Sequence, residues 1–309
     1  MCLIEQRWVG AVDGLNDILH GLEPSLGPLG GDPSPLEGGI TNRNYKVRFG
    51  EREYVLRLHG KDTDLLGISR EAERIANAAA ARLGIAPEVA ETFEGGLVTR
   101  FLTCAPLDAA EIATRAEEIA VALRAFHDAA VTLPIEFRVA GLLEDYARII
   151  AARGGEVPGA YQEARELAVR ITAALGGARL APCHNDLLPG NLVRERTADR
   201  IMIVDWEYAG MGHPFFDLGN LSVNNGFDEA TDERLLSAYH GAAPSRRQRA
   251  TLKLTRVLSD VREAAWGTMQ AQVSELDFDF DGYAEQHFAR LRAAVDGGHL
   301  GEWLAAAEG

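Results

Sequence analysis

The first hundred residues carry apolar side chains at every second position in several short stretches. Residues 45–49 alternate Tyr, Lys, Val, Arg and Phe, residues 50–53 form a polar turn, and residues 54–58 resume the extended pattern. This period of two predicts a β-hairpin, because successive side chains of a strand point to opposite faces of the sheet. A helix over residues 69–82 and a further strand over residues 96–102 complete a predicted small antiparallel sheet with one helix on it.

The rest of the chain changes to the 3.6-residue period that is typical of helices. Two short stretches interrupt that pattern. Residues 183–193, broken by Pro and Gly, predict a loop, and residues 201–204 predict a buried strand that ends at Asp205. Residues 21–39 are rich in Gly and Pro and predict loop and short extended pieces. The predicted helical segments are residues 108–130, 141–152, 158–176, 229–241, 245–273 and 281–296.

The length and composition suit two lobes. The chain has 309 residues, well beyond the roughly 150 that serve as a prior for one domain, and 47% of them are hydrophobic. We therefore expect an α+β protein. A mostly β N-terminal lobe would span residues 1–103, and a helical C-terminal lobe would span residues 104–309.

The charge and the cysteines narrow the classes of partner. The chain has 31 basic and 46 acidic residues, a net charge of −15, which argues against a nucleic-acid binder and suits a cationic partner. Three widely separated cysteines without zinc-site spacing are typical of the reducing cytosol. No apolar run approaches the roughly 18 residues needed to cross a membrane, and the start lacks a secretory signal. We expect a cytoplasmic protein with no membrane or nucleic-acid partner.

The strongest chemical signal combines one short motif with a more distant carboxylate. His184 and Asp186 are followed by Asn191, and Asp205 ends the strand predicted before it. Phosphoryl transfer needs a carboxylate beside the attacking hydroxyl and oxygen ligands for Mg²⁺. Asp186 suits the base, whereas Asn191 and Asp205 suit the metal, at separations found in kinase catalytic loops. A chance HxD motif would leave the spacing of these three polar groups unexplained.

The sequence resembles the choline/ethanolamine kinase and aminoglycoside phosphotransferase superfamily, and within it the bacterial choline-kinase-like phosphotransferases. The resemblance implies a protein-kinase-like two-lobe fold and an ATP- and Mg²⁺-dependent kinase that acts on an alcohol group. It also implies that His184 organises the catalytic loop and that Asp217 braces it. The segments that carry the resemblance are residues 38–45, 55–60, 184–193, 204–208 and 216–220, and Trp266 with residues 277–284.

The same resemblance implies where ATP binds. The loop at residues 38–45 would lie over the phosphates, and Arg57 stands at the strand position where most kinases place lysine. A guanidinium can bind phosphate through two N–H groups, so this change is compatible with function. Glu71 is its expected partner, with Glu73 as a competing choice, and a solvated Arg57 is the alternative interpretation. The implied nucleotide-binding residues are Gly39, Thr41, Asn42, Asn44, Arg57, Glu71, Phe101 and Leu102, the last two in a hinge beside the adenine.

The acceptor site is implied by four further positions. In choline kinases an aromatic box binds the quaternary ammonium by cation–π attraction, so choline, giving phosphocholine, is the first expected acceptor. Trp266 stands at helical spacing among apolar residues, which is equally typical of core packing. Eukaryotic choline kinases carry a substrate-facing Glu where this chain has Asn224. The implied acceptor residues are Glu207, Tyr208, Trp266 and Tyr283.

Other functions remain open at this point. Ethanolamine or thiamine would suit the same chemistry, and an aminoglycoside phosphotransferase would bind a polycation through carboxylates instead of aromatic rings. A non-catalytic pseudokinase is the alternative of another class, against which the intact set of Asp186, Asn191 and Asp205 argues. The expected partner is a small cationic acceptor, and a homodimer is left open.

Overall fold

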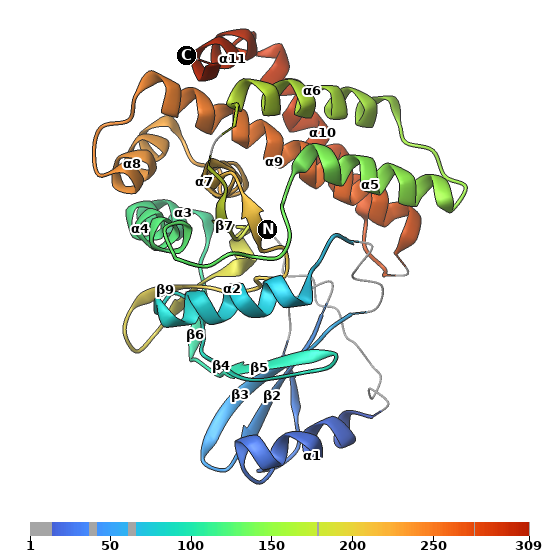
Figure 1. The fold of residues 1–309 in the computed structure, drawn as a ribbon, viewed down its shortest axis with the longest axis vertical. Coiled ribbons are helices and arrows are strands. Elements are labelled where there is room, and N and C mark those ends of the chain that lie inside the picture. Colours follow the sequence, from blue (N-terminus) through green and yellow to red (C-terminus); the bar gives the residue numbers. More distant parts are fainter. Residues whose placement is uncertain (1–13, 37–41, 61–65, 178, 275, 309) are drawn as a thin grey trace.

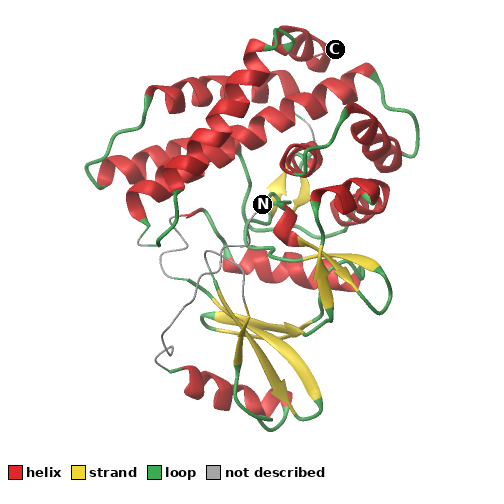
Figure 2. Ribbon diagram, turned by 180° about the vertical axis from the view of Figure 1, so that it is seen from behind, coloured by secondary structure: helices red, strands yellow, loops and turns green. Residues whose placement is uncertain are grey.

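The protein forms two lobes (Figure 1). The N-terminal lobe is an antiparallel sheet with a helix on its outer side, and the larger C-terminal lobe is mostly helical (Figure 2). The α+β fold with a small antiparallel sheet and a helical lobe is as predicted. The computed structural model describes residues 14–36, 42–60, 66–177, 179–274 and 276–308.

The sheet of the N-terminal lobe has five strands in the order β1-β2-β3-β5-β4, and all neighbours are antiparallel. The predicted hairpin is formed by the second and third strands, with Asn44 directly opposite Arg57. Residues opposite each other share one face of a sheet, so both side chains point the same way. The strands are β1 (Ser34–Leu36), β2 (Arg43–Phe49), β3 (Arg52–Leu58), β4 (Val89–Phe93) and β5 (Gly96–Arg100).

Helix α1 (Leu15–Leu26) packs on the sheet, although the prediction for residues 21–39 was loop and short extended pieces. Pro24 lies inside the last turn of this helix. Leu19 and Leu22 are buried in the same core as Phe49 of the sheet. The prediction was wrong for residues 21–26, because packing of an apolar face outweighs a poor local helix propensity.

Helix α2 (Arg70–Arg82) lies between the sheet and the C-terminal lobe (Figure 1). Its start is fixed by Ser69, whose Oγ accepts a hydrogen bond of 3.2 Å from the N–H of Ala72. Ala72 and Ala80 are buried in a core that also contains Trp206 of the other lobe. Small side chains let a helix approach its neighbours closely, so α2 is held at the junction of the lobes.

The C-terminal lobe is built around the long helix α9 (Arg246–Val273). Its other helices are α3 (Ala109–Thr114), α4 (Ala116–His127), α5 (Val139–Ala152), α6 (Gly159–Leu175), α7 (Pro214–Asn224), α8 (Glu229–His240), α10 (Phe280–Asp296) and α11 (Leu300–Glu308). Helices α5, α6, α7, α10 and α11 pack against α9 (Figures 1 and 2). The helix predicted over residues 108–130 is divided at Arg115 into α3 and α4.

Two small sheets hold the loop predicted over residues 183–193, which is shorter than predicted because Cys183 ends one strand and Leu192 begins another. In one sheet, β7 (Ala181–Cys183) pairs with β10 (Gly210–Gly212). In the other sheet, β8 (Leu192–Glu195) lies in the middle and pairs with β6 (Cys104–Pro106) on one side and with β9 (Arg200–Ile203) on the other. Leu192 at the start of β8 lies opposite Ile203 at the end of β9. Residues just before β8 and just after β9 therefore meet.

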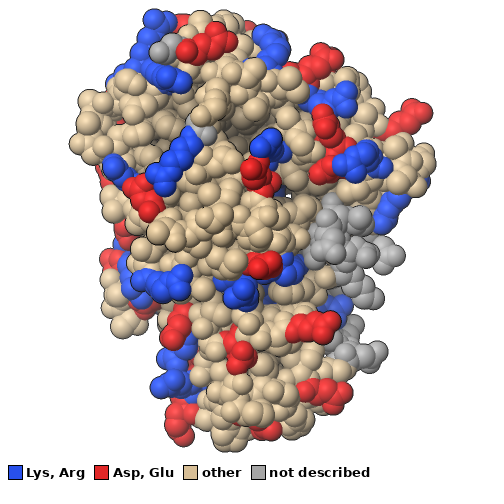
Figure 3. Space-filling model, viewed as in Figure 1, with Lys and Arg blue, Asp and Glu red and all other residues tan. Residues whose placement is uncertain are grey.

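The charged surface resembles that of an ordinary acidic protein. On the face in Figure 3, basic and acidic side chains are interspersed over both lobes. Nucleic-acid binders gather basic residues into a patch or stripe, which that face does not present. Among the described residues, no helix combines the length and the apolar character that crossing a bilayer would require.

Candidate active site

The loop that follows β7 is held by a buried carboxylate of α7. Asp217 accepts hydrogen bonds from the backbone N–H groups of His184 (2.8 Å) and Asn185 (2.7 Å), and Nε2 of His127 lies 3.0 Å from it. Burial alone would raise the pKa of Asp217, but His127, His184 and the backbone donor outweigh burial and lower it. Asp217 therefore braces the loop as a fully bonded carboxylate.

His184 uses both of its ring nitrogens within the loop. Nε2 lies 3.0 Å from the carbonyl oxygen of Val204, and Nδ1 accepts a hydrogen bond of 3.2 Å from the N–H of Asp186. Burial lowers the pKa of His184, which agrees with a neutral ring that accepts at Nδ1. His184 thus ties the loop to the residue after β9, and neither ring nitrogen is left for proton transfer.

Asp186 has both carboxylate oxygens engaged. Nδ2 of Asn191 donates to Oδ2 (3.0 Å), and Nη1 of Arg262 donates to Oδ1 (3.0 Å). Burial raises the pKa of Asp186 to about 8; Arg262 acts to lower it, and the carboxylate of Glu263 adds to the rise. A fixed carboxylate whose pKa lies near neutrality suits a general base.

Asn191 and Asp205 become neighbours through the pairing of β8 with β9. The carbonyl of Asn191 accepts a hydrogen bond of 3.0 Å from the N–H of Val204, and Asp205 follows directly. Asp205 has a φ of 65°, a left-handed conformation that is costly outside glycine and gathers at functional sites. Amide and carboxylate oxygens are the donors that Mg²⁺ prefers, so this pair fits a magnesium ion. Together with Asp186, the three predicted polar groups share one site.

Arg57 of β3 connects the sheet to this site. Its Nη1 lies 2.6 Å from Oδ1 of Asp205 and 3.3 Å from Oε1 of Glu73, and its Nε lies 3.4 Å from Oδ1 of Asn44. The side chain is 14% exposed. A guanidinium with three such partners is not a solvated surface arginine, so the alternative interpretation of Arg57 is excluded.

The prediction that Glu71 is the partner of Arg57 is wrong, because Glu73 takes that place. The Glu73 side chain is 1% exposed and also accepts a bond of 2.8 Å from Nη1 of Arg70. Glu71 is exposed and lines a hollow of about 390 Å³ beside β4 and β5. Residues two apart on an α-helix point roughly 200° away from each other, so only one of the two can face Arg57.

A second polar group at the lobe junction contains Asn42, Arg70 and Glu207. Nδ2 of Asn42 donates to Oε2 of Glu207 (2.8 Å), and Nη1 of Arg70 lies 3.5 Å from the same oxygen. Nη2 of Arg70 lies 3.5 Å from Oδ1 of Asn42. These bonds connect Glu207, which was predicted on the acceptor side, to the N-terminal lobe.

The predicted hinge residues Phe101 and Leu102 lie between β5 and β6, where the chain passes from one lobe to the other. The N–H of Phe101 donates to the carbonyl of Glu53 (3.0 Å), and Nζ of Lys46 lies 4.1 Å from the centre of its ring. The predicted loop residues Gly39 and Thr41 lie outside the described residues.

The predicted acceptor residues Tyr208, Trp266 and Tyr283 are brought together. Nε1 of Trp266 donates to the hydroxyl of Tyr208 (3.0 Å), and the rings of Trp266 and Tyr283 meet edge to face at 5.7 Å. Trp266 also packs edge-on against Phe280 and is 6% exposed, as expected for a core residue. The guanidinium of Arg262 lies 4.3 Å from the centre of the Tyr208 ring. The rings therefore form a packed cluster that already contains a cation.

Sequence reasoning missed Arg262 and its neighbour Glu263. Nη1 of Arg262 donates to Oε1 of Glu263 (2.7 Å) as well as to Asp186, and the hydroxyl of Tyr283 donates to Oε2 of Glu263 (2.8 Å). Both charged residues are buried. The available signal was that Asp260, Arg262 and Glu263 stand among apolar residues of a predicted helix, since full burial of such charged residues is rare without a partner.

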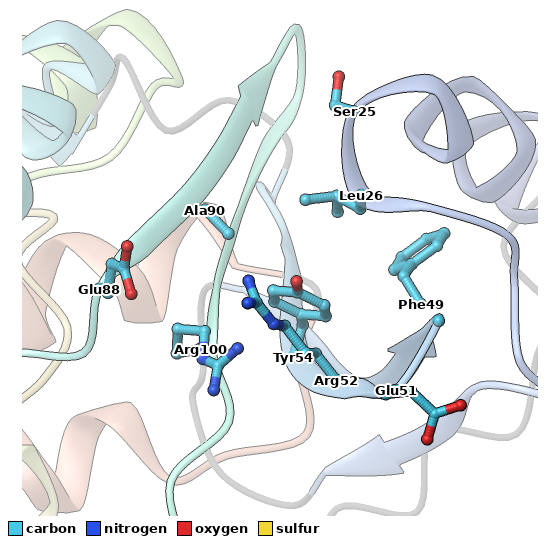
Figure 4. Close-up of a pocket in the computed structure, with 10 residues that line it drawn as sticks. Ser25, Leu26, Phe49, Glu51, Arg52, Tyr54, Glu88, Ala90 and Arg100 are labelled. Carbon is cyan, nitrogen blue, oxygen red and sulfur yellow. The ribbon is translucent and has the colours of Figure 1, made fainter.

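A hollow on the N-terminal lobe does not belong to this site. It has a volume of about 360 Å³ and lies between the end of α1 and the strands, where it is lined by Phe49, Arg52, Tyr54 and Arg100 among others (Figure 4). None of the predicted catalytic, metal or acceptor residues lines it. The candidate site is therefore the junction of the lobes around Asp186.

Comparison with known proteins adds independent evidence. A sequence profile of the choline/ethanolamine kinase family matches residues 34–252. "Probable choline kinase 1" of Arabidopsis thaliana is 24% identical over 295 residues, which cover 82% of this chain and 84% of the plant protein. A solved structure of a choline/ethanolamine kinase family protein from Mesorhizobium loti is 30% identical, with a TM-score of 0.79 over 95% of this chain and 98% of that one. The choline kinase LicA from Streptococcus pneumoniae is 24% identical, with a TM-score of 0.77 over 92% and 99% of the two chains.

Proposed function

The chain belongs to the choline/ethanolamine kinase family, phosphotransferases that act on alcohol groups, and from this membership we propose that it transfers the terminal phosphoryl group of ATP to the hydroxyl of a small amino alcohol in the cytoplasm. The fold is accordingly protein-kinase-like. The single observation that carries the proposal is the position of Asp186, which is fixed by Asn191 on one oxygen and Arg262 on the other.

Asp186 is the proposed base. The hydroxyl oxygen of the acceptor forms a bond to the terminal phosphorus, the bond from that phosphorus to the bridging oxygen breaks to release ADP, and the hydroxyl proton passes to Asp186. A carboxylate fixed by two neutral or cationic donors cannot turn away from its substrate, and positioning supplies most of the catalysis in phosphoryl transfer. The neutral His184 is bonded elsewhere, so Asp186 has no rival for this role within the loop.

The nucleotide side is assigned to residues on both lobes. Asn191 and Asp205 would hold a magnesium ion, which when bound neutralises charge on the phosphates. Arg57, oriented by Glu73 and Asn44, would contact those phosphates. The remaining nucleotide contacts are proposed for Gly39, Thr41, Asn42, Phe101 and Leu102.

A cationic amino alcohol is the proposed class of acceptor, with choline and ethanolamine as first candidates. Support comes from the aromatic cluster of Tyr208, Trp266 and Tyr283 and from the carboxylate of Glu263 within it. An aminoglycoside phosphotransferase is less well supported, because a polycation needs several exposed carboxylates and Glu207 is bonded to Asn42. A pseudokinase has no need of all three groups of Asp186, Asn191 and Asp205.

The test is an ADP-release assay with choline, ethanolamine, thiamine, homoserine and kanamycin, each with Mg²⁺ and with excess chelator. We expect turnover of at least one amino alcohol, its loss on chelation and its return with added Mg²⁺. Turnover of kanamycin alone would transfer the assignment to the aminoglycoside class. No turnover with any acceptor, together with no binding of MgATP, would contradict a kinase of either kind.

A further inference from the structure

The guanidinium of Arg262 has one edge that finds no partner in the part of the chain that the structure describes. Arg262 lies on α9, one helical turn before Trp266, and is 2% exposed. Its Nη1 makes both of its hydrogen bonds, to Asp186 and to Glu263. Its Nε and Nη2 are buried, and among the described residues neither has a hydrogen-bond partner. The two unpartnered nitrogens belong to the same side of the group, beside the proposed base.

That edge has a specific chemical match. The N–H groups on Nε and Nη2 are parallel, and this fork binds the two oxygens of a carboxylate in a planar, two-pronged arrangement. Buried donors without acceptors are unfavourable, so a ligand that supplies two oxygens at this position gains from both bonds. An acceptor with a hydroxyl and an ammonium group but no further oxygen leaves the fork unsatisfied.

The charges around Arg262 favour an acceptor that carries both signs. Arg262 faces two carboxylates, Asp186 and Glu263, so the three side chains carry one net negative charge when both carboxylates are ionised, and that charge favours an ammonium group. The guanidinium already lies on the face of Tyr208, where a quaternary ammonium would meet a like charge. A primary ammonium can offset that repulsion by donating hydrogen bonds to the carboxylate of Glu263, which a quaternary ammonium cannot do.

The phosphates of the nucleotide are the other possible source of oxygens, but they have a cation of their own. Arg57 is bonded to Asp205 and Glu73 on the side of the N-terminal lobe. Arg262 instead lies among Tyr208 and Glu263, and through Glu263 it connects to Tyr283. These are residues of the acceptor side.

Resting on the proposed function and narrowing its substrate, we propose that Arg262 determines specificity by binding a carboxylate of the acceptor. The acceptor is then a hydroxy amino acid, a zwitterion whose hydroxyl is directed at Asp186 while its carboxylate pairs with the Nε and Nη2 edge of Arg262. Choline and ethanolamine lack this group and are poorer substrates.

The wild-type protein tests this with matched pairs that differ only by the carboxylate. L-serine is ethanolamine with an added carboxylate, and L-homoserine stands in the same relation to aminopropanol. We expect the carboxylated member of at least one pair to have a kcat/KM at least about 10-fold higher, the effect of one charge-assisted bidentate contact. Amines or choline that surpass every carboxylated compound would overturn the proposal and leave the kinase assignment intact.

Variants of Arg262 separate carboxylate binding from other roles. Arg262→Met should raise KM for the preferred hydroxy amino acid about 10- to 100-fold and remove its advantage over the matched amine, and Arg262→Lys should fall between, because lysine keeps the charge without the fork. Arg247→Met is the matched control, an exposed arginine on the same helix. Because Arg262 also fixes Asp186, both members of a pair should lose kcat in Arg262→Met. If the ratio of kcat/KM between the carboxylated member and its matched amine is the same in Arg262→Met as in the wild type, the proposal is overturned.

One further measurement does not depend on a folded variant. L-alanine and L-2-aminobutyrate keep the ammonium and carboxylate but have no hydroxyl, so they should inhibit wild-type turnover competitively against the acceptor, whereas ethylamine and propylamine should not. Inhibition by the amines alone would overturn the proposal. Absence of turnover with every acceptor, with MgATP still bound, would remove this inference and the amino-alcohol acceptor together.

Discussion

The guanidinium of Arg57 and the carboxylate of Asp205, 148 residues apart in the sequence, lie 2.6 Å apart and join the two lobes. One belongs to the third strand of the sheet and the other to the residue pair that follows β9. In the proposed function the first contacts phosphate and the second contacts Mg²⁺. The ion pair therefore places the proposed phosphate cation and the proposed metal ligand side by side.

Glu73, and not Glu71, should orient Arg57 in its ion pair with Asp205. Glu73→Gln removes the buried charge that faces Arg57, so KM for MgATP should rise about 10-fold, the worth of one charge-assisted contact. Glu71→Gln, two positions away on the exposed side of α2, is the matched control and should stay within about twofold. Steady-state kinetics with varied MgATP will check this, and equal effects of both substitutions would contradict it.

Asp186→Asn should remove the base while keeping its shape. We expect kcat to fall by a factor of about 10² to 10⁴, the usual contribution of general base catalysis, with KM for MgATP changed only a few-fold. The control is Asp128→Asn, an exposed carboxylate directly after the C-terminal end of α4. Circular dichroism of both variants should match the wild type, and an Asp186→Asn protein that retains a tenth of the activity would exclude Asp186 as the base.

Asp217→Asn should act on stability. The amide would present an NH₂ group to one of the donors at His184, Asn185 or His127, all of which bond to Asp217. Breaking a buried charged network of this kind costs about 3 kcal/mol or more in the free energy of unfolding. Urea unfolding followed by circular dichroism measures the change. A loss below 1 kcal/mol would mean that Asp217 does not brace the loop.

His213, the N-cap of α7, should make the fold less stable in acid. Burial lowers the pKa of His213 to about 4 from an ordinary 6.5, so the neutral ring is favoured in the folded protein. The contribution of neutral His213 to the free energy of unfolding is complete above pH 6.5 and is lost as the pH falls toward 4. The reason is that the histidine of the unfolded chain binds a proton at a higher pH than that of the folded protein. We expect a loss of about 1–2 kcal/mol between pH 7 and pH 5, allowing for partial exposure.

The control for this prediction is His213→Asn, which keeps an acceptor for the N–H of Phe215 but does not titrate. Unfolding of both proteins across this pH range should show a weaker dependence for the variant. The same pH dependence in both would assign the effect to other groups.

Local patterns were sufficient for the elements and residues that depend on near neighbours. The β2–β3 hairpin follows from the alternation at residues 45–49 and 54–58, and the candidate catalytic loop follows from the short interval between Asp186 and Asn191. The strand of apolar residues before Asp205 could also be predicted from the local sequence, because a short buried strand needs little more than β-favouring side chains.

What the sequence did not reveal depends on contacts between distant segments. The choice between Glu71 and Glu73 is set by the rotation of α2 about its axis, which the C-terminal lobe fixes by burying its alanine face. Arg262 is 76 residues from Asp186, and no spacing rule connects the two. Helix α1 likewise exists because Leu19 and Leu22 find apolar partners on the sheet.

Helices α7 and α9 contribute different residues to the candidate site, and this separation bears on how the enzyme could be redesigned. The carboxylate that secures the catalytic loop comes from α7, whereas Arg262, Glu263 and Trp266 occupy little more than one turn of α9. If the proposed roles hold, exchanging those three positions in a small combinatorial library would sample new acceptors while Arg57, Asn191 and Asp205 stay unchanged.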